Sequence, residues 1–155
     1  MKILVVGLFL IVCGGCYRVG PPPAVAESVR VVVVANDARL VRGQASLQSE
    51  VAEALTQRLG WQVDPAGSAR LDISLAREDQ NETAGDRRGI PARWSITLHG
   101  IAKLRSRNGE IAHAWRGVGH ASGLNDEAAA LDQAAHNGAA EIAAWLQATV
   151  PELRK

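Results

Sequence analysis

Cysteine is scarce in this 155-residue sequence, and its two cysteines, Cys13 and Cys16, both lie near the N-terminus. The rest of the chain therefore has no thiol with which to form a disulfide or a thiolate metal site. Aromatic residues are also few, with one Phe and one Tyr, so aliphatic side chains and four Trp must fill the core. Hydrophobic residues make up 47% of the chain, enough for the core of one ordinary domain.

An excess of charge of either sign is missing as well. Lys and Arg together number 17, and Asp and Glu together number 16. Binding to nucleic acid, or to membrane surfaces in general, depends on a marked positive excess. The composition therefore favours neither function.

The first sixteen residues are typical of a bacterial targeting segment. Lys2 supplies a positive charge, and residues 3–12 are an uninterrupted apolar run. As a helix this run is about 15 Å long, half of the roughly 30 Å hydrocarbon core, so it suits a signal peptide better than a membrane span. Residues 14–16 (Gly-Gly-Cys) then resemble the lipobox of bacterial lipoproteins, although Cys13 stands where Leu is usual.

This resemblance predicts three parts. Residues 1–15 are a signal peptide, residues 16–27 comprise the lipidated Cys16 and a proline-rich tether, and residues 28–150 form a periplasmic α+β domain. Tyr17, rather than Asp, follows the cysteine, which favours a lipid-anchored location on the outer membrane, facing the periplasm. An ordinary secretory signal with incidental cysteines is the alternative.

Hydrophobic periodicity in the domain predicts the element order β-α-β-β-β-α. Strands are expected at residues 28–35, at 71–76, at 94–104 and after Asn108-Gly109, and helices at 46–59 and 126–148, with a polar loop at 78–91. Ser46 is expected to cap the first helix, and Gly60 to end it in a left-handed conformation. Small residues in the seam of the last helix allow close approach to a sheet or to another helix. The fold class is therefore an α+β two-layer sandwich, with a four-stranded, mainly antiparallel sheet covered by two helices.

Asn108-Gly109 is the strongest short hairpin signal in the chain, because both residues tolerate a positive φ. A two-residue loop at this dipeptide pairs Arg107 with Glu110 and Ala102 with Trp115. Each pair joins side chains that fit each other in charge or in size.

Motifs of catalysis and metal binding are not found. The sequence has no Gly-x-Ser-x-Gly elbow, no His-Glu-x-x-His pair and no P-loop. The hairpin register makes His99 and His120 diagonal neighbours, about 7–8 Å apart, but no flanking acid completes a metal site. We therefore expect neither enzymatic activity, nor a cofactor, nor a resident metal.

Several segments resemble the lipopolysaccharide-assembly lipoprotein family (LptE). The similar segments are residues 16–20 (Cys-Tyr-Arg-Val-Gly), the Val-rich strand, the Leu-x-x-x-Val-x-x-Ala-Leu-x-x-x-Leu helix, Asp64-Pro65, residues 91–97 and Asn108-Gly109-Glu110. The Gly that usually stands between the cysteine and the tyrosine is missing. The resemblance implies a sheet covered by two helices, inside a large outer-membrane β-barrel (LptD), as its plug and assembly partner. Some members bind lipopolysaccharide and help to deliver it to the outer leaflet.

Lipopolysaccharide binding calls for residues that can meet phosphates, and the planar fork of arginine suits them. The basic residues that flank the polar loop or approach the hairpin tip are Arg87, Arg88, Arg93, Lys103, Arg105 and Arg107. We hypothesise that the hairpin tip or the Arg87-Arg88 loop contacts lipopolysaccharide. The alternative, a solvated charged rim, is the commoner meaning of such residues.

Three functions stay open. The leading one is a lipoprotein, without enzymatic activity, that assists lipopolysaccharide assembly beside an LptD-like barrel. The second is a periplasmic adaptor lipoprotein that regulates a cell-wall synthase or a transport complex. The third, a lipoprotein enzyme, is disfavoured because no catalytic motif is present.

Overall fold

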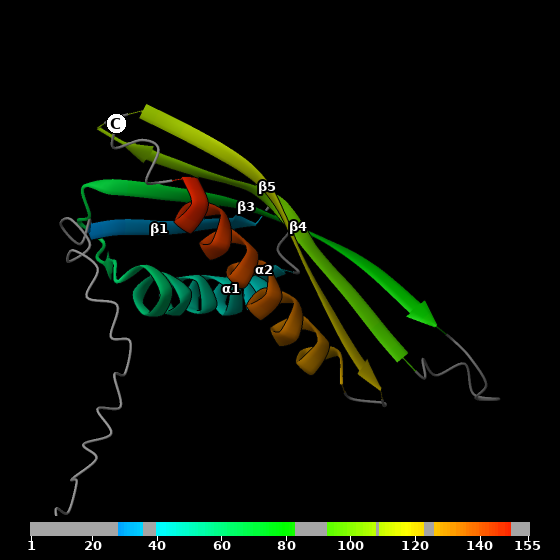
Figure 1. Ribbon diagram of the computed structural model, residues 1–155. Coiled ribbons are helices and arrows are strands. Elements are labelled where there is room, and N and C mark those ends of the chain that lie inside the picture. The colour runs from blue at the N-terminus through cyan, green and yellow to red at the C-terminus, as the bar shows by residue number, and fades with distance from the viewer. Residues whose placement is uncertain (1–27, 36–39, 83–92, 108, 123–125, 150–155) are drawn as a thin grey trace, which may run out of the picture.

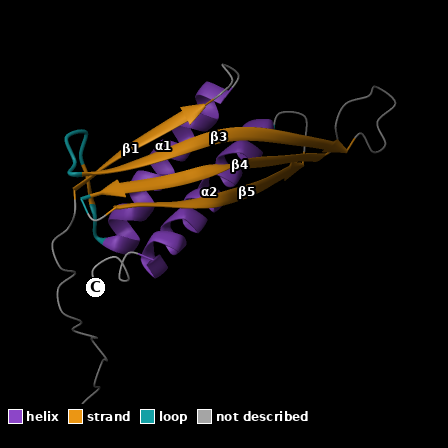
Figure 2. Ribbon diagram, turned by 90° about the horizontal axis from the view of Figure 1, so that it is seen from above, coloured by secondary structure: helices purple, strands orange, loops and turns teal. Residues whose placement is uncertain are grey.

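The computed structural model describes residues 28–35, 40–82, 93–107, 109–122 and 126–149. Its elements are β1 (Ser28–Ala35), α1 (Val41–Ala54), the π-helical turn η2 (Leu55–Leu59), β2 (Gln62–Val63), β3 (Ala69–Glu82), β4 (Arg93–Ser106), β5 (Gly109–Ser122) and α2 (Glu127–Thr149). The strands form one curled sheet, and both helices lie on the same side of it (Figures 1 and 2). The predicted α+β class, with two layers, is confirmed.

The sheet has five strands in the order β2-β1-β3-β4-β5, rather than the four predicted. β1 runs parallel to both β2 and β3, whereas the pairs β3–β4 and β4–β5 are antiparallel. β2 was missed because two residues are too few to show a periodic pattern. β1 and β3 are parallel because α1 crosses between them, as connections between parallel strands require.

The first helix begins at Val41 rather than at Ser46. Ser46 therefore lies inside the helix, and its hydroxyl donates a hydrogen bond to Asp132 Oδ1 on α2 at 2.7 Å. The predicted capping role of Ser46 is wrong. Leu40, just before the helix, is buried, so tertiary packing accompanies the extra N-terminal turn.

The predicted apolar seams of both helices are confirmed. The buried residues of the first seam are Leu47, Val51 and Leu55, and those of the second include Leu131, Ala135, Gly138 and Ile142. Gly60 follows the π-helical turn with a φ of 65°, which is the predicted left-handed end of the helix. The core between these seams and the sheet is mainly aliphatic, as the composition requires.

The hairpin of β4 and β5 forms, but its register differs from the predicted one. Glu110 pairs with Arg105, so the predicted pair with Arg107 is wrong. Gly109 is already the first residue of β5, with a φ of 134°, and Arg107 lies in the turn. Asn108 lies outside the described residues. A shift of two residues keeps every side chain on its predicted face, because side chains alternate with a period of two.

The same shift changes two other predicted pairs. Trp115 lies opposite Gly100, not Ala102. His120 lies four residues beyond the position opposite His99, instead of two. The two histidines are therefore not diagonal neighbours.

β3 is longer than predicted and continues to Glu82, through the first part of the expected polar loop. Its last residues pair with β4 from Arg93 onward. An antiparallel ladder needs only backbone groups, so a polar sequence can extend a hairpin that hydrophobic patterning would end. The rest of that loop, residues 83–92, lies outside the described residues.

The regular backbone pairing of β3 with β4 is interrupted at Ser74. The Ser74 hydroxyl accepts a hydrogen bond from the Ile101 N–H at 2.8 Å and donates one to the Ile101 carbonyl at 3.3 Å. A Cβ at Gly100 would lie 1.9 Å from the Ser74 carbonyl oxygen, so only glycine permits this approach. A side chain thus replaces a backbone partner within the β3–β4 pair, whose long strands are curved (Figure 1).

α2 rests directly on the backbone of β5. A Cβ at Gly117 would lie 2.0 Å from the Ala134 carbonyl oxygen, and one at Gly119 would lie 1.8 Å from the Ala130 carbonyl oxygen. The predicted close approach of the last helix to the sheet is confirmed. It depends on glycines in the strand as much as on small residues in the helix.

α2 also covers the outer edge of β5 along residues 116–120. Three of its side chains at four-residue intervals bond to the strand backbone: Gln133, Asn137 and Glu141. Gln133 accepts from the His120 N–H at 2.7 Å, Asn137 donates to the Val118 carbonyl at 2.8 Å, and Glu141 accepts from the Arg116 N–H at 2.9 Å. These three residues, the α2 polar ladder, satisfy backbone groups that a free edge strand would expose.

Candidate functional site

The side of the sheet opposite the two helices, the open face, is not covered by any described helix (Figure 2). The strand register arranges its side chains in rows across β1, β3, β4 and β5. From the hairpin end, the basic row is Arg30, Arg70, Arg105 and Glu110; the middle row is Val32, Asp72, Lys103 and Ala112; and the apolar row is Val34, Ser74, Ile101 and Ala114.

Ion pairs hold part of the basic row in place. Asp72 lies between two arginines, with Oδ1 2.6 Å from Arg70 Nε and Oδ2 3.2 Å from Arg105 Nη1. Arg105 Nε also lies 2.7 Å from Glu110 Oε2. The hydrogen bond to Glu110, followed by the charges of Glu110 and Asp72, raises the pKa of Arg105 above its ordinary value. Arg105 is thus a fixed cation whose fork is largely engaged within the protein.

Positive charge nevertheless exceeds negative charge at this end of the sheet. With Arg107 in the turn, the basic and middle rows hold five cations against the carboxylates of Asp72 and Glu110. No described residue forms an ion pair with Arg30, Lys103 or Arg107. These three side chains are therefore the ones available to an external anion.

The apolar row is unusual for a surface. Val34 is 52% exposed and Ile101 is 47% exposed, which makes them two of the three large hydrophobic side chains exposed among the described residues. Val32 lies beside Val34 on β1, and Ala112 and Ala114 on β5 lie beside Ile101, whereas Ser74 on β3 separates these two apolar groups. Exposed apolar side chains grouped in this way are candidates for binding contacts.

The spacing of the rows defines what could bind. Neighbouring rows are two residues apart along each strand. The basic and apolar rows, with the middle row between them, are therefore four residues apart, or about 13 Å. A ligand that bridges them must carry anionic groups at one end and apolar chains at the other. The open face therefore suits an anionic amphiphile.

The six basic residues proposed from the sequence do not converge on one place. Lys103, Arg105 and Arg107 gather at the hairpin end of the open face. Arg93, at the opposite end of β4, lies about 40 Å away along the strand. Arg87 and Arg88 lie outside the described residues, as does Cys16.

Sequence reasoning missed Arg30 and Arg70. Each alternates with buried neighbours in its strand, so its outward direction was readable from the sequence. The row was not readable, because it depends on the parallel register that sets Arg30 beside Arg70. No local signal specifies that register.

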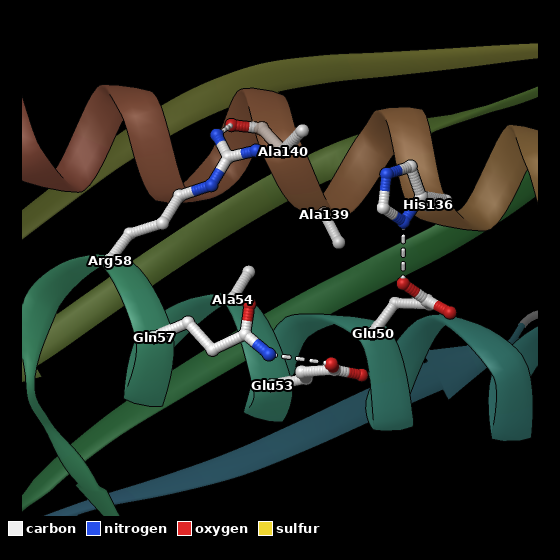
Figure 3. Close-up of a pocket in the computed structure, with 8 residues that line it drawn as sticks. All are labelled: Glu50, Glu53, Ala54, Gln57, Arg58, His136, Ala139 and Ala140. Carbon is white, nitrogen blue, oxygen red and sulfur yellow. Dashed lines mark hydrogen bonds and ion pairs between the residues drawn. The ribbon is translucent and has the colours of Figure 1, made fainter.

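A recess of about 300 Å³ lies between α1 and α2 on the side away from the sheet (Figure 3). Its lining residues are Glu50, Glu53, Ala54, Gln57, Arg58, His136, Ala139 and Ala140. The polar groups bond to one another or to backbone: Glu50 Oε2 lies 2.8 Å from His136 Nδ1, Gln57 donates to Glu53 at 2.7 Å, and Arg58 reaches the Ala140 carbonyl at 3.5 Å. They do not converge on a common point in Figure 3, as a catalytic group would.

Two further features bear on function. In the part of the chain that the structure describes, no three His, Cys, Asp or Glu side chains gather as metal ligands. Nor is any helix there both long and apolar enough to cross a bilayer.

The fold places the chain in a class: α+β proteins in which a curled sheet carries two helices on one face and leaves the other open. No protein-family model matches the sequence, and no curated protein does. Among solved structures, a protein from Xanthomonas campestris described as a DUF330 member has a TM-score of 0.56 and 16% identity, covering 85% of this chain and 92% of that one.

Rare lipoprotein B from Shewanella oneidensis is also similar. Its TM-score is 0.50 and its identity 11%, over 81% of this chain and 99% of that one. At such identities the similarity shows the fold alone. The fold of this chain is therefore one that a bacterial lipoprotein adopts.

Proposed function

We propose that this chain is a lipid-anchored bacterial lipoprotein of the LptE kind. In this proposal it is held at the outer membrane through Cys16, and it assists lipopolysaccharide assembly as the plug and partner of a large LptD-like β-barrel. The lipobox-like Gly-Gly-Cys, the segments similar to the LptE family and the fold shared with a rare lipoprotein B support it.

One observation carries the lipopolysaccharide part of the proposal, namely the basic and apolar rows side by side on the open face. Lipopolysaccharide combines phosphates with acyl chains, so it matches both rows at once. Arg30, Lys103 and Arg107 would meet phosphate, while Val34 and Ile101 would meet an acyl chain. The open-face site replaces the group of six basic residues expected from the sequence, because Arg93 is too distant to share a ligand with the hairpin end.

The charges on the helices support a barrel partner. Several of them bond to a partner on the other helix, such as Arg42 to Asp132 at 3.4 Å and His136 to Glu50 at 2.8 Å. A polar helix surface suits the polar inner wall of a β-barrel. The proposal includes no enzymatic activity, since the polar groups of the recess between the helices are bonded within the protein.

The first test is extraction of the tagged chain from its native membrane in mild detergent, followed by mass spectrometry of the bound proteins. An abundant large outer-membrane β-barrel is the expected result. Recovery of a cell-wall synthase or a transporter would instead support the adaptor function, and recovery of no partner would contradict both.

The second test measures binding of fluorescent lipopolysaccharide to the purified chain in detergent. The variant Arg30→Glu/Lys103→Glu/Arg107→Glu is expected to bind at least about tenfold more weakly, since it loses three charge-assisted contacts. The charge-matched control is Arg58→Glu/Arg93→Glu/Arg116→Glu, away from the hairpin end. Equal weakening of both variants would show a nonspecific effect of net charge and would remove the open-face site.

A further inference from the structure

The segment between Cys16 and the domain joins the sheet at one particular end. β1 begins at Ser28, and the strand register places this start at the same end of the sheet as the tip of the β4–β5 hairpin (Figure 1). Eleven residues separate Cys16 from Ser28, and they reach at most about 40 Å when fully extended. The hairpin end of the sheet therefore stays close to whatever surface holds Cys16.

The charges of the strands differ between the two ends of the sheet. At the hairpin end, the basic and middle rows and Arg107 hold five cations and two carboxylates. One further carboxylate there, that of Asp64 after β2, accepts a hydrogen bond from the Ala66 N–H at 2.7 Å. From Arg77 outward on β3, and from the positions paired with it on β4 and β5, the strands contain two arginines and three acidic residues. Positive charge is thus concentrated at the end that the segment from Cys16 joins.

The cations of the hairpin end are accessible and spread over its width. The exposed ones are Arg30, Arg70, Arg105 and Arg107. Asp72 holds Arg70 and Arg105 in place, whereas Arg30 and Arg107 form no ion pair with a described residue. Arg30 and Arg105 lie two strands apart, about 10 Å. Cations spaced in this way fit a surface that carries many anions better than they fit one small anion.

We propose that the hairpin end of the sheet contacts the anionic phospholipid headgroups of the bilayer in which the chain is anchored. This inference rests on the lipid anchor of the proposed function and adds a second membrane contact, made by the folded domain. A lipid anchor and a cluster of basic residues commonly act together at anionic membranes. Because the anchor already confines the domain, the cations meet headgroups at a high effective concentration, and a weak attraction is enough.

The contact orients the whole domain. β4 is about 45 Å long, so the two ends of the sheet are far enough apart to meet different surroundings. Anionic headgroups attract the hairpin end and repel the acidic residues of the other end. The strands therefore stand away from the bilayer instead of lying flat on it, and the helices stay free for a protein partner.

Fluorescence quenching in vesicles tests this orientation. The chain lipidated at Cys16, in a Cys13→Ser background, carries one labelled cysteine, either Ala112→Cys or Ser122→Cys. Both positions are exposed on the same face of β5, ten residues or about 33 Å apart. The vesicles consist of phosphatidylcholine, with or without phosphatidylglycerol, and include a lipid with a quencher on its headgroup. They contain no lipopolysaccharide, so phospholipid headgroups are the only anions offered.

In vesicles with phosphatidylglycerol, the label at residue 112 should be quenched at least about threefold more strongly than the label at residue 122. The difference should fall by at least about half with phosphatidylcholine alone, and likewise at about 1 M salt, where the Debye length is about 3 Å. Neither comparison needs a substitution at the cations themselves.

Charge reversal locates the contact. The triple variant that should lose the difference is Arg30→Glu/Lys103→Glu/Arg107→Glu. The charge-matched control, away from the hairpin end, should keep it and is Arg42→Glu/Arg93→Glu/Arg116→Glu.

Three results would overturn the proposal. Equal quenching at the two labels, in a chain that floats with anionic vesicles, would exclude the contact and leave the lipid anchor intact. A difference just as large with phosphatidylcholine alone would show that the length of the connecting segment, and not charge, orients the domain. A chain that does not float with the vesicles would remove the lipid anchor and this contact with it.

Discussion

The contact between α2 and β5 makes a quantitative prediction for Gly117→Ala. The new Cβ would lie 2.0 Å from the Ala134 carbonyl oxygen and 2.5 Å from the Gly138 nitrogen. Both are backbone atoms, so no side chain can rotate away, and α2 must withdraw by more than 1 Å. Overpacking usually costs about 1–3 kcal/mol, and we expect about 3 kcal/mol here because the helix moves as a unit.

The assay is urea unfolding of the full chain in mild detergent, followed by tryptophan fluorescence. A loss of about 3 kcal/mol corresponds to a midpoint about 10 °C lower in a thermal scan of a chain this size. Gly43→Ala is the matched control, since its Cβ would lie 3.4 Å from the flexible Leu131 side chain, inside a helix where Ala is favoured. A Gly117→Ala variant within about 1 kcal/mol of wild type would refute the close-contact reasoning.

Two further substitutions test the polar details. Trp115→Phe is expected to change the unfolding free energy, measured in urea, by less than about 1 kcal/mol. The Trp115 Nε1 is buried without a hydrogen-bond partner, so removing this donor offsets the loss of side-chain volume. A loss above about 3 kcal/mol would contradict this. Gln133→Ala is expected to speed hydrogen exchange of the His120 amide about fivefold, since one hydrogen bond contributes about 1 kcal/mol. The control Gln57→Ala loses only a bond to Glu53, so the exchange rate of the His120 amide should not change.

The sequence was sufficient to predict the helices and the long strands, because their hydrophobic patterns are periodic. Leu47, Val51 and Leu55 repeat at helical intervals, and Gly60 marks the helix end through its own backbone preference. The start of α1 was misjudged because packing around Leu40 extended the helix through a polar stretch. The turn residue of the hairpin was misplaced by one position, which alternation alone cannot detect.

The candidate site was less predictable than the fold. Lys103, Arg105 and Arg107 were identified because they are close together in the sequence. Arg30 and Arg70 joined them through the pairing of distant strands. The internal pairing of Arg105 with Asp72 and Glu110 likewise follows from the final register, so its reduced availability to a ligand could not be read beforehand.

The α2 polar ladder has a consequence for how far this protein can assemble. A sheet that accepts strands at both margins can add copies without limit and grow into a fibre. Gln133, Asn137 and Glu141 bond to three successive outward groups of residues 116–120, so an added strand would have to displace all three side chains to pair with this part of β5. Growth by strand addition is therefore disfavoured along that stretch of the sheet margin.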